Sequence, residues 1–293
     1  MKNLNRRTFI KNTALAGAVT FLGSTRCNRA ESIPSNRVIL IRDKNLLDDL
    51  HRPRAGRAER MLDQAVTTLL NDDDPVSCWK RLVNADDMVG VKSNEWRFLP
   101  TPAELEAAIE KRLMNAGVPG KNISIDDRGI RSNPVFQNAT ALINVRPMRT
   151  HHWSGLGTLL KNYIMFVKRP YEYHSDSCAD LATIWKRPDV AGKTRLNILV
   201  MFTPLFHGIG PHHYNPEYVW AYKGMIVGFD PVAVDSVGMR IMQAKRTVHF
   251  GEERPLNPPA KHIELADTRH HLGTADAAKI DLIKLGWKED ILI

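Results

Sequence analysis

The sequence predicts an α/β protein with a mostly parallel central sheet and flanking helices, folded as a single compact domain after a signal segment. Two observations support this class. Short apolar, β-branched runs alternate along the chain with longer segments whose apolar residues recur at helical spacing, an order typical of a layered α/β structure. No low-complexity stretch or linker divides the chain beyond its N-terminal segment, so a second domain is not expected.

The first half of the domain alternates strands and helices. Strands are expected at 38–42, 88–92 and 122–126, and helices at 54–70, 75–83 and 101–118. The last of these helices has the clearest boundaries. Thr101 is expected to cap its N-terminus, with Glu104 completing a capping box. Pro102 suits the first helical position and Gly117 the end of the helix.

The second half continues the alternation, with strands expected at 139–145, 195–202 and 224–229 and a helix at 230–246. Before the second of these strands lies HHWSGLGTLLKN (151–162), where glycines and reactive side chains precede an apolar run. Gly155 and Gly157 would let the backbone approach a ligand closely, and a helix N-terminus favours an anion. The same letters also fit a helix start with a polar flank and no ligand, so both interpretations stay open.

The N-terminal segment accounts for most of the positive charge. The formal net charge is +9, and residues 1–30 contain six basic residues and no acidic one. The six are Lys2, Arg6, Arg7, Lys11, Arg26 and Arg29. The rest of the chain has 35 basic and 32 acidic residues. This near balance does not favour a nucleic-acid-binding surface, so no nucleic-acid partner is expected.

The same segment has the pattern of a twin-arginine signal peptide. Arg6 and Arg7 precede a short apolar run that passes into small residues near Ala30. The run is too short for a membrane-spanning helix, which needs about 20 apolar residues, so no transmembrane span is expected in the mature chain. The pattern predicts export by the twin-arginine machinery to the periplasm or another extracytoplasmic space. A basic amphipathic helix is the alternative, and a lipid anchor at Cys27 is less favoured because Arg26 precedes it.

Cysteine content limits the cofactors that the chain can hold. After the signal segment only Cys78 and Cys178 remain. Two cysteines cannot supply the four thiolates of an iron–sulfur cluster, so no protein-encoded cluster is expected. The two thiols could pair in an oxidising compartment, but the sequence does not place them together. The twin-arginine route carries folded proteins, often with a cofactor inserted, and the identity of any cofactor stays open.

Polar residues at strand ends are the first candidates for a site. In an open α/β sheet, ligands gather beyond the carboxyl ends of the strands. Lys92 and Asn94 follow the strand at 88–92, and Asp230 stands between a strand and a helix. The commoner role of such an aspartate is to cap the helix. Asp235 lies in an apolar stretch of that helix, where a buried carboxylate must be paired or hydrogen-bonded.

Histidines are candidate metal ligands. His207, His212 and His213 share a loop with two glycines and two prolines. Their spacing is not that of the helical pair of a zinc protease. A solvated histidine-rich loop is therefore favoured over a metal site, and no particular metal is indicated.

Taken in order, the motifs resemble one family, the domain of unknown function 362 (DUF362) proteins in their twin-arginine-exported form. DDMVGVKSN, THHWSGLGTLLKNY, YEYHSDSC and GMIVGFDPVAVDSVG carry the resemblance along the chain. It is expected to cover residues 36–293, after the signal peptide. The resemblance rests on the order of the motifs, since none of them is specific alone.

The resemblance implies where the site lies. The recurring polar positions of the family match predicted catalytic residues His151, Lys161, His174 and Asp235 and predicted ligand-binding residues Lys92, Asn94, Asn162 and Asp230. The chain departs from the family pattern in two places. Phe202 and Thr203 stand where relatives often have an aspartate, and the segment after Cys178 is shorter than expected. If that aspartate completes a metal or acid–base site, this member would be altered or inactive.

Three functions fit these residues. The first is an exported enzyme acting on an anionic small molecule, with lysines and Asn94 holding the anion and histidines transferring protons. The second is a protein that binds an anionic ligand or metal complex without turnover. The third is a structural or partner-binding role, in which the same side chains are caps and core hydrogen bonds. Convergence of the side chains on one pocket would exclude the third.

Overall fold

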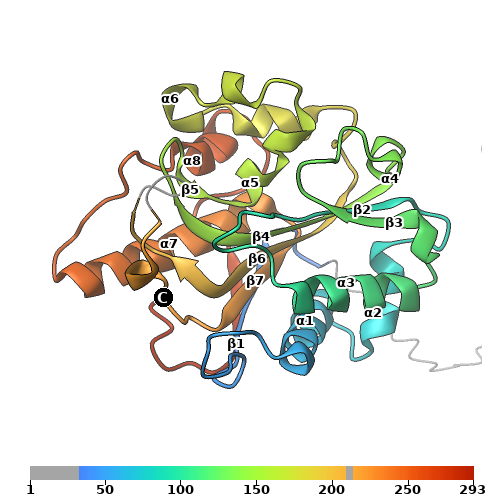
Figure 1. The fold of residues 1–293 in the computed structure, drawn as a ribbon, viewed down its shortest axis with the longest axis horizontal. Coiled ribbons are helices and arrows are strands. Elements are labelled where there is room, and N and C mark those ends of the chain that lie inside the picture. The colour runs from blue at the N-terminus through green and yellow to red at the C-terminus, as the bar shows by residue number, and fades with distance from the viewer. Residues whose placement is uncertain (1–32, 209–213) are drawn as a thin grey trace, which may run out of the picture. The chain divides into compact units, whose positions relative to one another are not determined.

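The computed structural model describes residues 33–208 and 214–293. Ile33–Ile293 form one compact unit, with helices on both faces of an eight-stranded sheet (Figure 1). The predicted fold class is therefore confirmed. The signal peptide predicted at 1–30 lies outside the described residues, as do His212 and His213.

The sheet is mixed but mostly parallel. Its strands are β1 (Arg37–Arg42), β2 (Val89–Lys92), β3 (Ile123–Asp126), β4 (Ala141–His151), β5 (Gly155–Gly157), β6 (Thr194–Leu205), β7 (Gly224–Gly228) and β8 (Asp281–Gly286). They follow the order β3-β2-β4-β6-β7-β1-β8, and β5 pairs with β4. In the described part of the chain, β7 is antiparallel to β6 and β1, β5 is antiparallel to β4, and the other pairs are parallel. The carboxyl ends of β2, β3 and β4 therefore meet at one edge of the sheet.

Helices cover the two faces of the sheet and bury two apolar cores (Figure 1). One face carries α1 (Ala55–Leu70), α2 (Pro75–Leu82) and α3 (Ala103–Asn115). The other carries α4 (Pro134–Gln137), α5 (Leu159–Asn162), α7 (Pro231–Phe250) and α8 (Lys261–Thr268). The connections contain α6 (Ser175–Cys178) and the 3-10 segments η1 (Gly120–Asn122), η2 (Tyr163–Phe166), η3 (Pro170–Tyr173), η4 (Leu181–Lys186) and η6 (Pro216–Tyr218).

Helix α1 shows why periodicity predicts these elements. Its buried residues are Ala58, Met61, Leu62, Ala65, Val66, Leu69 and Leu70. They recur at helical spacing, so one stripe of the helix faces the core. Full burial of each large aliphatic side chain contributes about 1.5–3 kcal/mol, which fixes this face against the sheet.

The predicted N-terminal cap of α3 is wrong, whereas the predicted end at Gly117 is confirmed, because Gly117 follows the C-cap residue Ala116 and has a φ of +105°. The helix begins at Ala103, and no side chain caps its N-terminus. The hydroxyl of Thr101 instead accepts a hydrogen bond from the backbone N–H of Asn94, at 3.1 Å. Thr101 therefore stabilises the loop that follows β2, which is one wall of the candidate site.

Strand β4 is longer than predicted. The run expected at 139–145 continues through Pro147 to His151. A proline lacks the N–H for a strand ladder and is unusual inside a sheet. The register with β6 shifts between Pro147 and Arg149, which interrupts the ladder and the regular alternation of side chains. Helix α8 and strand β8 were not predicted, because neither has a clear apolar periodicity.

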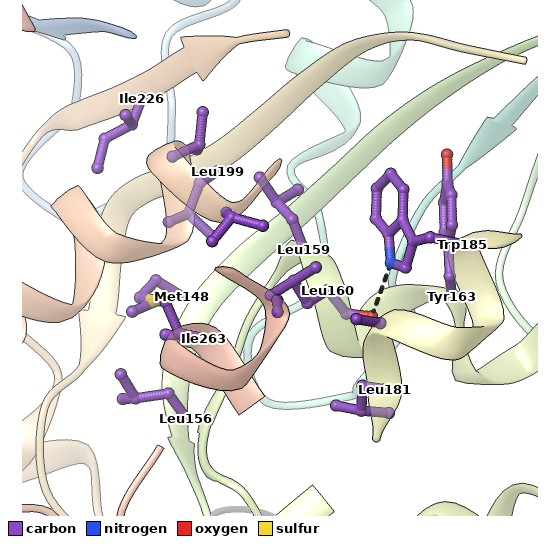
Figure 2. Close-up of a cluster of buried hydrophobic side chains, with 14 of the residues drawn as sticks. Met148, Leu156, Leu159, Leu160, Tyr163, Leu181, Trp185, Leu199, Ile226 and Ile263 are labelled. Carbon is purple, nitrogen blue, oxygen red and sulfur yellow. Dashed lines mark hydrogen bonds between the residues drawn. The ribbon is translucent and has the colours of Figure 1, made fainter. Parts of the chain in front are cut away.

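Helix α5 is a single turn that its surroundings hold in place. Leu159 and Leu160 are fully buried and pack in the apolar cluster of Figure 2 with side chains from β4, β6 and α8. Trp185 Nε1 donates a hydrogen bond to the carbonyl of Leu160 at 3.4 Å. A helix this short is not stable alone. Tertiary packing therefore sets the position of the two residues that end it, Lys161 and Asn162.

The two cysteines of the domain are unpaired. Cys78 is buried in the core beside α1–α3 and Cys178 in the core on the opposite face. They therefore do not form the disulfide that their sequence left open. Within the described residues, no helix has the length and apolar character needed to cross a membrane.

Candidate functional site

A pocket opens where the carboxyl ends of β2, β3 and β4 meet, and its volume is about 340 Å³. Five predicted site residues line it: Asn94, His151, Lys161, Asn162 and His174. The lining also contains Trp96, Asp127, Arg128, Arg146, Arg149, Trp153, Ile164, Met165 and Pro170. The other three predicted residues, Lys92, Asp230 and Asp235, are not part of the lining. The structure thus brings together five of the eight, at the edge of the sheet where ligands were expected.

Lys92 is fully buried behind the pocket wall. Its Nζ donates to Asp127 Oδ1 at 2.5 Å, to the Ser93 carbonyl at 2.6 Å and to Asn162 Oδ1 at 3.3 Å. These three acceptors match the three N–H groups of an ammonium, so none remains for a ligand. Burial lowers the pKa of Lys92 to about 8, and the charge of Asp127 opposes this shift. Lys92 ties β2 to the segment after β3 and to α5.

A buried, hydrogen-bonded chain of asparagines begins at the pocket lining and runs into the sheet. The Asn162 side chain donates to Asn144 Oδ1 at 2.9 Å and to the Lys92 carbonyl at 3.0 Å. Asn144 donates to Asn197 Oδ1 at 3.1 Å, and Asn197 donates to the Phe229 carbonyl at 2.9 Å. The chain joins α5 to β4, β6 and the end of β7. Asn162 therefore lines the pocket, while its side-chain amide joins α5 to β2 and β4.

Asp235 caps α5 from the neighbouring helix α7. It is fully buried, and its two oxygens accept the backbone N–H groups of Leu159 and Leu160, both at 2.9 Å. The helix N-terminus that was expected to attract a ligand is thus occupied by a carboxylate of the chain itself. Burial raises the pKa of Asp235 to about 7, and the two backbone bonds oppose the rise. Asp235 is not part of the pocket lining, but it holds the turn that carries Lys161, and its charge opposes the lowering of the pKa of Arg146.

Asp230 has the capping role that is common before a helix. Its Oδ1 accepts from the N–H groups of Val232 at 2.8 Å and Ala233 at 3.2 Å, at the start of α7. Its Oδ2 accepts from the N–H of Thr274 at 2.7 Å. These bonds connect the start of α7 to the segment after α8, and Asp230 lies outside the pocket lining.

The two glycines of HHWSGLGTLLKN (151–162) make room for other parts of the protein. Gly155 has a φ of +70°, and a Cβ there would collide with the carbonyl of Pro258. A Cβ at Gly157 would lie 2.7 Å from a terminal nitrogen of Arg146. A backbone carbonyl thus approaches Gly155 and an arginine side chain approaches Gly157, and the approach of a ligand to these glycines stays a prediction.

Two arginines that the sequence reasoning did not single out dominate the pocket. Arg146 and Arg149 are each only 4% exposed, and the Nε of each is buried without a hydrogen-bond partner. Among the described residues, no carboxylate forms an ion pair with either guanidinium. Burial lowers the pKa of Arg146 to about 10 and that of Arg149 well below its usual value. Buried cations are normally paired, so these two are unusual.

Arg149 has partial support from the loop after β2. It donates to Asn94 Oδ1 at 2.9 Å and stacks over the Trp96 ring at 4.6 Å from its centroid. In a regular strand, residues three apart point to opposite faces. The register shift between Pro147 and Arg149 interrupts that rule, and both guanidinium groups line the same pocket.

Lys161 has a different environment from Lys92. Its Nζ contacts Cys178 Sγ at 3.4 Å, and the side chain lines the pocket. Burial lowers the pKa of Lys161 to about 8, and the charges of Arg146 and Arg149 add to the shift. Burial raises the pKa of Cys178, so at neutral pH it is a thiol and not a counter-ion.

The backbone that presents Cys178 is strained. Asp176, Ser177 and Cys178 have φ values of 46°, 57° and 65°, in the left-handed region that costs a residue with a side chain about 1–2 kcal/mol. Strain of this kind clusters at functional sites. Here it places a thiol against the amine of Lys161.

The two histidines of the pocket are uncharged at neutral pH. Trp153 donates its backbone N–H to His151 Nδ1 at 3.2 Å, so the neutral ring carries its proton on Nε2 and offers a donor. Burial lowers the pKa of His151 well below its usual value, with Lys161 adding to the effect. Burial lowers the pKa of His174 to about 4, and its ring stacks on Trp153 at 3.8 Å.

The described residues contain no group of three or more His, Cys, Asp or Glu side chains arranged to hold a metal ion. His207 belongs to a different contact, since its Nδ1 lies 3.1 Å from a guanidinium nitrogen of Arg246. The pocket lining combines cationic, amide and aromatic groups with Asp127 and the apolar residues Ile164, Met165 and Pro170.

These features define an α/β protein with a basic pocket at the carboxyl edge of a mostly parallel sheet. Residues 118–240 match the family described as Domain of unknown function (DUF362), and over these residues the chain contains a DUF362 domain. The match covers Arg146, Arg149, Lys161 and Asp235 but stops short of Lys92. The wider extent predicted for the family, 36–293, stays a prediction outside the matched residues. No curated protein and no solved structure matches the chain.

Proposed function

We propose that the pocket binds a small organic anion and that the protein is an enzyme acting on it. One observation carries the proposal: Arg146 and Arg149 are both buried in the lining of one pocket, and no carboxylate of the described residues forms an ion pair with either. Leaving a buried charge without a partner costs several kcal/mol. A ligand carboxylate or phosphate in the pocket supplies the missing partner.

The balance of charge in the lining supports an anionic ligand. Arg128, Arg146, Arg149 and Lys161 bring positive charge to the pocket, and Asp127 is its acidic lining residue. Asp127 is already paired with Lys92 at 2.5 Å, and its other oxygen lies 3.9 Å from Arg128. The neutral His151 ring adds an Nε2–H donor. A structural role alone does not account for so many unpaired donors around one cavity.

Two groups favour an enzyme over a binding protein. The amine of Lys161 has no carboxylate partner in the part of the chain that the structure describes, and His174 is a neutral ring that can accept a proton. Both line the pocket that holds the two arginines. Asp235 was predicted as a third catalytic group, and we propose instead that it positions Lys161. A binding protein without turnover needs the arginines only.

Calorimetry with inorganic phosphate, pyruvate and 2-oxoglutarate tests the anion site. In Arg146→Met we expect affinity to fall about 10- to 100-fold, because a charged hydrogen bond contributes about 1.5–3 kcal/mol. Arg131→Met is the matched control, since Arg131 is exposed on the loop after β3. Unchanged affinity in Arg146→Met, or no binding of any of these anions to the unaltered protein, would refute the proposal.

The proposal places this chemistry outside the cytoplasm. Its support is the twin-arginine pattern at Arg6 and Arg7, which lies outside the described residues. Replacing both with lysine in the full chain should abolish delivery by the twin-arginine machinery, measured by cell fractionation. Delivery at the unaltered level would contradict this part of the proposal, and would leave the anion site unaffected.

A further inference from the structure

Lys161 is the one lysine of the pocket lining, and its surroundings differ from those of an ordinary buried lysine. An amine held by a carboxylate stays protonated and cannot attack a carbonyl carbon. Among the described residues no carboxylate pairs with Lys161. Its polar contact is the Sγ of Cys178 at 3.4 Å, and burial keeps that thiol neutral by raising its pKa.

We propose that Lys161 forms an imine with the carbonyl carbon of a 2-oxo carboxylate whose carboxylate group is held by Arg146 and Arg149. This inference rests on the proposed anion site and adds the covalent chemistry and the ligand class. A 2-oxo acid has its carboxylate on the carbon next to the carbonyl. It therefore suits a pocket in which an amine and two guanidinium groups are neighbours.

Arg146, Arg149, Lys161 and the two histidines line the same cavity, and their charges act on one another. The charges of Arg146 and Arg149 both lower the pKa of Lys161, and the charge of Lys161 lowers the pKa of His151 and His174. Nearby cations and burial are the two means by which proteins produce a nucleophilic lysine. With a pKa of about 8, about one Lys161 amine in ten is neutral at pH 7.

The reaction needs no further reactant. The ammonium of Lys161 first loses a proton, and the nitrogen lone pair then attacks the carbonyl carbon. The carbonyl oxygen takes up two protons and leaves as water, while a carbon–nitrogen double bond forms. Summed, an ammonium and a carbonyl become a protonated imine and water, with no change in charge or oxidation state. The neutral ring of His174 can carry the first proton to the departing oxygen.

The rest of the lining suits the remainder of such a ligand. Ile164, Met165 and Pro170 form an apolar wall, and an aliphatic side chain of an oxo acid would contact it. His151 offers its Nε2–H to the carbonyl oxygen as negative charge develops there. The cavity of about 340 Å³ is sufficient for a small oxo acid.

Reductive trapping of the exported protein tests the imine. The protein is incubated with pyruvate and sodium borohydride, and the product is analysed by intact mass and peptide mapping. We expect one reduced adduct, on Lys161 and not on Lys92. In Lys161→Arg the yield should fall about tenfold or more. Lys168→Arg is the matched control, because Lys168 is exposed a few residues along the same segment and should leave the yield unchanged.

Lactate separates failure of the imine from failure of the anion site. It has the carboxylate of pyruvate but no carbonyl, so it should bind by calorimetry and compete with trapping. Binding of pyruvate and lactate without an adduct would overturn the imine and leave the anion site standing. Adducts spread over exposed lysines, or retained in Lys161→Arg, would also overturn it. If neither acid binds and Arg146→Met changes no anion affinity, both proposals fail.

Discussion

Two buried lysines lie on either side of the pocket wall, and they differ in nearly every respect except charge and pKa. Burial lowers the pKa of both to about 8. Lys92 donates to three acceptors, among them the carboxylate of Asp127. Lys161 contacts one thiol and lines the cavity. A shifted pKa does not by itself mark a site, because the contacts of a buried lysine decide whether its amine is available.

The two environments arise from different pieces of chain. Lys92 ends a strand, and Asp127 follows the next strand in the sheet, so their pairing joins neighbouring parts of one edge. Lys161 lies in the single turn α5, which Asp235 holds from α7. Lys92 thus forms an internal cross-link, whereas Lys161 is held in position with no carboxylate partner among the described residues. Each of the following predictions changes one side of this comparison.

Removal of the two ammonium groups should give the largest difference. Lys92→Met leaves the buried carboxylate of Asp127 without its partner, and we expect a loss of about 3–5 kcal/mol in the free energy of unfolding. Lys161→Met removes a buried cation with no counter-charge, so the unliganded variant should be as stable as the parent or more stable. Urea unfolding at pH 7 measures both. Lys168→Met, at an exposed position, is the control and should stay within about 0.5 kcal/mol. Equal losses of stability in Lys92→Met and Lys161→Met would contradict the difference proposed between the two lysines.

The two lysines should make a distinct contribution to the pH dependence of the free energy of unfolding. Their folded pKa of about 8 lies below the unfolded value of about 10.4. Between these values the unfolded chain binds more protons, so stability rises with pH. Each lysine contributes up to about 3 kcal/mol to the rise. Lys161→Met should lose its share between pH 8 and 10, which urea unfolding at several pH values measures. A parallel curve for parent and variant would contradict the burial of a charged Lys161.

Much of the fold could be predicted because buried apolar residues recur at a regular spacing in the sequence. The apolar stripe of α1 and the β-branched runs of β2 and β6 appear where they were expected. The failures have physical causes. Thr101 has a hydroxyl that suits a helix cap, but the nearby loop takes it as an acceptor. Pro147 is a residue that normally ends a strand, and the register shift beside it lets β4 continue.

The site was predictable in position but not in composition. His151 stands before the glycine bend and Lys161 after it, and both line the pocket at the edge of the sheet that the strand ends indicated. Arg146 and Arg149 stand in the same stretch, yet an arginine in a sequence is most often on the surface. Their burial depends on Gly157, which leaves space for one guanidinium, and on the register of β4. Neither can be read from one chain without its fold.

The role of Asp235 gives the smallest but most specific test of the comparison, because Lys161 depends on α5 and Lys92 does not. In Asp235→Asn one backbone N–H of α5 loses its acceptor, and we expect a loss of about 1–3 kcal/mol in the free energy of unfolding. Asp230→Asn is the matched control, since Asp230 on the same helix accepts three backbone N–H groups outside the pocket. The two variants should lose similar stability, measured by urea unfolding.

Calorimetry with pyruvate then distinguishes them: affinity should fall several-fold in Asp235→Asn as Lys161 shifts, and stay unchanged in Asp230→Asn. The pH dependence of the free energy of unfolding gives a second test of the role of Asp235. The folded pKa of Asp235, about 7, lies above the unfolded value of about 3.9, so its contribution to stability falls as pH rises from about 4 to 7. Asparagine does not titrate, so Asp235→Asn should flatten that decline. Equal pyruvate affinity in both variants would show that Lys161 does not depend on this cap.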